Sequence, residues 1–137
     1  MKILAKLTMI VATTVMILSA CTDTKKQEKD ALNEVIKIHD EAMANSEKAM
    51  KNKMLLDSLT KTATIDTIKA PAVIKDLSTA DKAMEDWMHQ FNADYTGKAH
   101  EEIMQYLADQ KKKVSQVNNQ LNTAVSQSNK FLATNKK

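Results

Sequence analysis

Glycine and proline each occur once in the 137 residues, as Gly97 and Pro71. Folds that contain a β-sheet need many tight connections, and these draw on glycine and proline because few other residues adopt the required backbone angles. A chain with a single copy of each is therefore expected to form a few long helices, in the all-α class. Aromatic residues make up only 4% of the chain, so the core must be built from Leu, Ile, Val, Met and Ala.

Apolar residues recur at intervals of three and four in three separate stretches, which is the pattern of helices with one buried face. The pattern predicts helices over residues 29–59, 71–91 and 98–132. The stripe of the first helix comprises Leu32, Val35, Ile36, Ala42, Met43, Ala49, Met50 and Leu56. The stripe of the second comprises Val73, Leu77, Ala80, Met84, Trp87 and Phe91. The stripe of the third comprises Ile103, Leu107, Gln110, Val114, Val117, Leu121, Ala124, Ser128 and Phe131.

Two segments without helical periodicity separate these helices. Residues 60–70 are rich in threonine and lead into Pro71, and residues 92–98 contain Gly97. Because short connections place consecutive helices side by side in opposite directions, we expect an up-down-up three-helix bundle. The alternative is a long helical hairpin with coiled-coil character, since the third stripe keeps its 4-3 spacing over four heptads.

The N-terminal segment has the organisation of a secretory leader. Lys2 and Lys6 precede an uncharged, largely apolar run over residues 7–18. These 12 residues are too few for a membrane span, which needs about 20. The sequence that follows resembles the lipobox of bacterial lipoprotein signal peptides, and it reads Leu18-Ser19-Ala20-Cys21.

The lipobox resemblance implies that residues 1–20 are a signal peptide and that Cys21 is lipidated by a diacylglyceryl thioether. Two or three palmitate-type acyl chains hold a protein stably to a membrane, because each buried methylene contributes about 0.8 kcal/mol. The expected location is the cell envelope, at the outer membrane on its periplasmic or surface face. Residues 21–30 lack an apolar period and are expected to form a flexible tether. Residues 31–134 would then form the bundle domain, with a polar tail over residues 135–137.

The charge of the chain beyond the leader is nearly balanced. It holds 18 lysines and 17 acidic residues, a net charge of +1, and it contains no arginine. A mixed surface without arginine is not typical of nucleic-acid binding, so we expect no nucleic-acid partner. The single cysteine rules out a disulfide within the chain and any multi-cysteine metal site.

Histidine and methionine offer one candidate for a metal site. If the second helix returns alongside the first, His39, His89 and His100 all lie toward one end of the bundle. Met43 follows His39 by one helical turn, and a His/Met pair suits copper, while imidazole also binds zinc. The alternative is that each histidine is solvated or paired with a neighbouring acid, such as Glu85 beside His89. We expect no resident cofactor.

No motif of an enzyme is present, and adjacent acids such as Asp40 and Glu41 point about 100° apart on a helix instead of converging. Trp87 and Phe91 are expected in the thickest part of the core, or in a patch that binds a partner. Two segments resemble small helical lipoproteins labelled "viral A-type inclusion protein", a label that implies no activity. These segments are His39-Asp40-Glu41-Ala42-Met43 and Met84-Glu85-Asp86-Trp87-Met88.

These features together predict a non-catalytic, membrane-anchored module. It would act in the envelope as a spacer, by self-association, or by contact with an envelope protein. Metal binding through His39 and Met43 with His89 or His100 is the alternative function.

Overall fold

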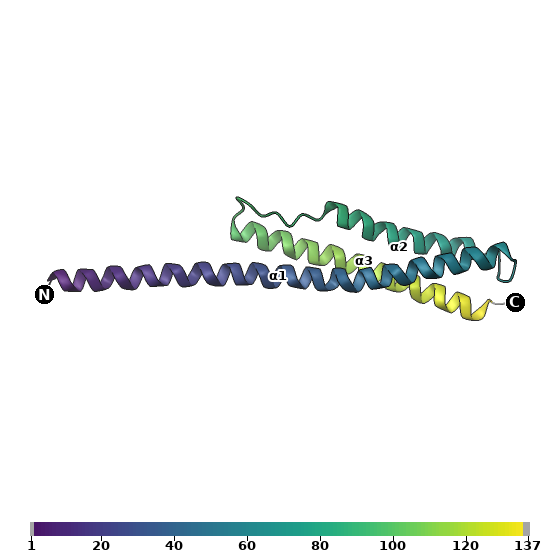
Figure 1. The fold of residues 1–137 in the computed structure, drawn as a ribbon, viewed down its shortest axis with the longest axis horizontal. Coiled ribbons are helices and arrows are strands. Elements are labelled where there is room, and N and C mark those ends of the chain that lie inside the picture. Colours follow the sequence, from purple (N-terminus) through teal and green to yellow (C-terminus); the bar gives the residue numbers. More distant parts are fainter. Residues whose placement is uncertain (1, 136–137) are drawn as a thin grey trace.

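The computed structural model describes the backbone of residues 2–135 and the side chains of residues 23–135. It consists of three helices, α1 (Lys2–Lys61), α2 (Ala70–Gln90) and α3 (His100–Thr134). Each helix packs against the other two, with α2 running back along α1 and α3 running forward again (Figure 1). The predicted all-α, up-down-up three-helix bundle is therefore confirmed.

Helix α1 is much longer than the helix predicted over residues 29–59. It continues through residues 22–30, where the sequence predicted a flexible tether, and it projects beyond the bundle toward the N-terminus (Figure 1). Lysine, glutamine and glutamate are good helix formers, and side-chain pairs one turn apart stabilise this stretch. Lys26 binds Asp30 at 2.9 Å, and Gln27 donates to Asp23 at 3.2 Å. Within the described part of the chain, no helix combines the length and apolar character that a membrane span requires.

The core is formed by a narrow line of α1 side chains enclosed by α2 and α3. On α1, every seventh residue is almost fully buried, namely Val35, Ala42, Ala49 and Leu56. Helix α2 contributes Ala70, Leu77, Ala80, Met84 and Trp87. On α3, the predicted stripe is buried throughout except for Val117, which is half-buried. Small residues such as Ala42 and Ala80 at these buried positions leave little side-chain bulk between neighbouring helices.

Polar side chains join the helices halfway along the bundle. Asn45 of α1 donates to Asn118 of α3 at 2.8 Å, and the neighbouring Ser46 donates to Asp81 of α2. About two helical turns further along α1, Asn52 donates to Ser128 of α3 at 2.7 Å. Because a buried polar group is stable only when it is hydrogen-bonded, these pairs favour one alignment of the three helices over shifted ones.

Both connections are shaped by local hydrogen bonds. Between α1 and α2, the Asp66 carboxylate accepts from the backbone amides of Lys69 and Ile68, at 3.1 and 3.0 Å. The hydrogen bond from the Lys69 amide, and to a smaller extent that from the Ile68 amide, lowers the pKa of Asp66. The carboxylate therefore stays ionised and keeps the turn closed. Between α2 and α3, Gly97 has a φ of +76°, a backbone conformation that favours glycine.

Candidate functional site

A second row of apolar side chains on α1 lies outside the core. Ile36, Met43 and Met50 each follow a buried residue by one position, yet their exposed fractions are 43%, 40% and 52%. The sequence pattern assigned both rows to one buried stripe, and for these three residues that assignment is wrong. Helices α2 and α3 cover the row that starts at Val35. Neither helix reaches far enough around α1 to cover the row that starts at Ile36.

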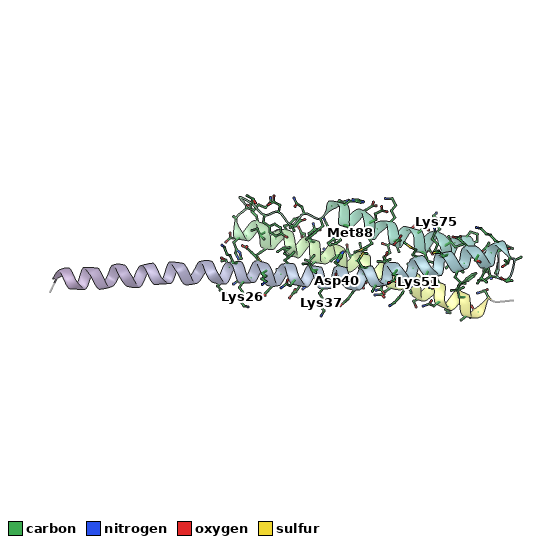
Figure 2. All side chains as sticks on the ribbon, viewed as in Figure 1. Lys26, Lys37, Asp40, Lys51, Lys75 and Met88 are labelled. Atoms are coloured by element: carbon green, nitrogen blue, oxygen red, sulfur yellow. The ribbon has the colours of Figure 1, made fainter. Side chains whose placement is uncertain are left out.

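The exposed row forms one side of a groove between α1 and α2. We use "α1–α2 groove" for the surface lined by Ile36, Met50 and Met54 of α1 and Met88 of α2, together with the exposed Met43, which lies between Ile36 and Met50 in the same row. Two hollows open along it, of about 420 Å³ beside Ile36 and Met88 and about 470 Å³ beside Met50 and Met54. In Figure 2, Met88 lies on α2, and Asp40 and Lys51 lie along α1. Methionine is flexible and polarisable, so this surface can adapt its shape to an apolar partner.

Aromatic rings support the end of the groove that lies near Met88. The Trp87 ring stacks on Phe91 with a centroid distance of 5.1 Å, and the His39 ring lies 5.8 Å from Trp87. Phe91 in turn stacks on Tyr106 of α3 at 6.2 Å. Trp87 is only 7% exposed, so the prediction that it lies in the core is confirmed. His39, Trp87 and Phe91 also line the hollow beside Met88, which makes the wall of the groove rigid at this end.

Carboxylates border the groove on both sides. On α1, Asp40 and Glu47 occupy the positions between the exposed apolar residues, one turn after Ile36 and Met43. On α2, Asp81 and Glu85 line the hollow beside Met50. The hydrogen bond from Lys51, at 2.6 Å, lowers the pKa of Glu47, so this carboxylate is ionised at neutral pH.

Lysines also line the groove, in the same hollow as Asp81 and Glu85. Lys53 lines the hollow beside Met54, and Lys82 is bound to Asp86 at 2.6 Å. The surface is therefore an apolar strip with carboxylates on both edges and with lysines beside those of α2.

The structure does not bring the three histidines together. His39 keeps Met43 one turn away on α1, but its Nδ1 pairs with Asp40 at 3.0 Å. His100 pairs with Glu28 at 2.8 Å, and Glu28 precedes His39 by three helical turns, about 16 Å. His89 is largely exposed and lies 3.8 Å from Glu85. Among the described side chains, no three His, Cys, Asp or Glu residues converge as metal ligands.

Two predicted features fall outside the described residues. The side chain of Cys21, the predicted lipidation site, is not among those described, and neither are residues 136 and 137 of the predicted polar tail. No protein-family model, no curated protein and no solved structure matches this chain.

The α1–α2 groove itself was not found from the sequence. Two parallel rows, each repeating every seven residues, were the available signal. Spacing alone does not tell which of two neighbouring rows a partner helix covers.

Proposed function

We propose that this protein is a lipid-anchored, non-catalytic interaction module of the bacterial cell envelope. Cys21 would carry the lipid, and the bundle would present the α1–α2 groove to another envelope protein. The groove is the observation that carries the interaction role. Contiguous apolar surface on a soluble domain typically marks a place where another molecule binds.

The anchor is supported by the lipobox sequence and by its position on α1. Cys21 precedes Glu28, which pairs with His100 of α3, by only seven residues along one continuous helix. A lipid at this position would therefore hold the bundle close to the membrane in a defined orientation. The proposal thus combines a lipid anchor, a continuous helix that joins the anchor rigidly to the bundle, and an adaptable binding surface.

Lipidation is tested by substituting the acceptor cysteine. We expect the wild-type protein to incorporate labelled palmitate and to fractionate with membranes, and the Cys21→Ser variant to lose both properties. Thr22→Ser, which changes the neighbouring residue and retains the thiol, serves as the control. Palmitate incorporation that persists in Cys21→Ser would contradict the proposed anchor.

The interaction role is tested by photo-crosslinking in intact cells. A photoreactive amino acid at Met43 should capture another envelope protein, whereas the same group at the exposed Gln116 of α3 should not. Equal crosslinking from both positions, or none from Met43, would show that the groove is not a binding surface.

A further inference from the structure

We propose that the occupant of the α1–α2 groove is an amphipathic helix of a partner protein, with an apolar stripe bordered on both sides by lysine or arginine. This inference rests on the proposed interaction role, and it does not depend on the lipid anchor. The shape of the groove, the charges along its edges and the exclusion of other occupants carry it.

The shape fits one further helix. From Ile36 to Met54, the groove follows α1 for 18 residues, about 27 Å or five helical turns. Ile36, Met43 and Met50 repeat at seven-residue intervals, which is the spacing at which one helix meets another along a coiled-coil seam. A helix laid between α1 and α2 would turn the three-helix bundle into a four-helix arrangement, in which the exposed methionines become core residues.

The charges specify what borders the stripe of that helix. Asp40 of α1 lines the hollow beside Met88, and Asp81 and Glu85 of α2 line the hollow beside Met50. Lysine and arginine side chains from the partner would lay their aliphatic stems over the methionines and reach these carboxylates with their charged ends.

A second copy of this chain fits less well. If two copies share one membrane, their α1 helices run parallel, and the exposed rows then place Asp40 against Asp40. Like charges at such positions oppose association. An antiparallel pair relieves this repulsion only by placing the two Cys21 residues at opposite ends of the dimer. Direct contact with an anionic membrane surface is opposed by the same carboxylates.

The test uses the full-length protein from expressing cells, held in nanodiscs of zwitterionic phospholipid. Two fluorescent peptides of about 18 residues serve as probes, with the same leucine stripe at helical spacing and with either lysine or glutamate along both edges. We expect the lysine peptide to bind about tenfold more tightly than the glutamate peptide, and Asp40→Lys combined with Glu85→Lys to reverse this preference. Empty nanodiscs measure binding to the lipid alone.

Substitutions separate the groove from the rest of the surface. Met43→Glu should weaken binding of the lysine peptide at least about tenfold, whereas Gln116→Glu, which introduces the same residue at an exposed site of α3, should leave it unchanged. Because Met43 is already 40% exposed, the substitution leaves the core intact.

The outcomes that would overturn the inference are specific. Equal affinity for the two peptides, no binding of either, or binding that Met43→Glu does not weaken would contradict a basic helical partner. If Met43 nevertheless crosslinks to another envelope protein, the interaction role stands and only the chemistry assigned to the partner is wrong. If Met43 crosslinks to a second copy of the chain, the groove is a dimer interface.

Discussion

At the scale of single residues, Gln110 is a buried polar side chain that opposes stability. Gln110 interrupts the apolar stripe of α3 and is 5% exposed, and its Oε1 has no hydrogen-bond partner among the described groups. A buried polar atom without a partner costs about 1–3 kcal/mol relative to its solvated state. Gln110→Met, which keeps the length of the side chain and removes its polar atoms, should therefore raise the free energy of unfolding by about 1 kcal/mol.

Chemical denaturation followed by circular dichroism measures this change. Gln116→Met, at an exposed position of the same helix, is the matched control and should change stability by less than about 0.5 kcal/mol. A loss of stability in Gln110→Met would show that the amide of Gln110 contributes hydrogen bonds that the static structure does not contain.

At the scale of the helices, α3 was predictable from the sequence and α1 was only partly so. The stripe of α3 is buried as predicted because α1 and α2 both cover it. On α1, periodicity gave the correct helical face but not its width, so Met43 and Met50 were assigned to the core. The extension through residues 22–30 also escaped prediction, because local polar pairs such as Lys26–Asp30 stabilise it instead of an apolar stripe. The groove depends on both helices, and no pattern within either one reveals it.

The two rows of α1 should differ sharply in their tolerance of larger side chains. Ala42 is 0% exposed and lies in the buried row, whereas Ala44 is exposed on the same helix. Ala42→Leu should lower the free energy of unfolding by about 1–3 kcal/mol, because the added atoms have no space between the helices. Ala44→Leu should change it by less than about 0.5 kcal/mol. Similar losses in equilibrium denaturation of both variants would contradict the assignment of buried and exposed rows.

At the scale of the whole molecule, the continuity of α1 gives the two ends of the bundle different positions relative to the proposed anchor. Lys61, where α1 ends, follows Cys21 by 40 residues of helix, about 60 Å. The connection between α2 and α3 lies at the opposite end, because His100 contacts Glu28 close to Cys21 (Figure 1). A lipid on Cys21 would therefore place Lys98 near the membrane and Lys61 far from it.

Fluorescence energy transfer from a donor on the bundle to an acceptor in the lipid headgroups distinguishes this rigid helical connection from the flexible tether that the sequence suggested. A donor attached at Lys98→Cys should transfer efficiently, and a donor at Lys61→Cys should transfer little, because transfer falls steeply over the length of α1. Similar efficiencies at the two positions would mean that the bundle tumbles about a flexible segment. Inserting two glycines after Lys25 should bring the transfer efficiencies at the two positions closer together, since glycine weakens a helix by about 1 kcal/mol per residue. The same insertion should leave peptide binding at the α1–α2 groove intact, because the groove begins only at Ile36, eleven residues beyond the inserted hinge.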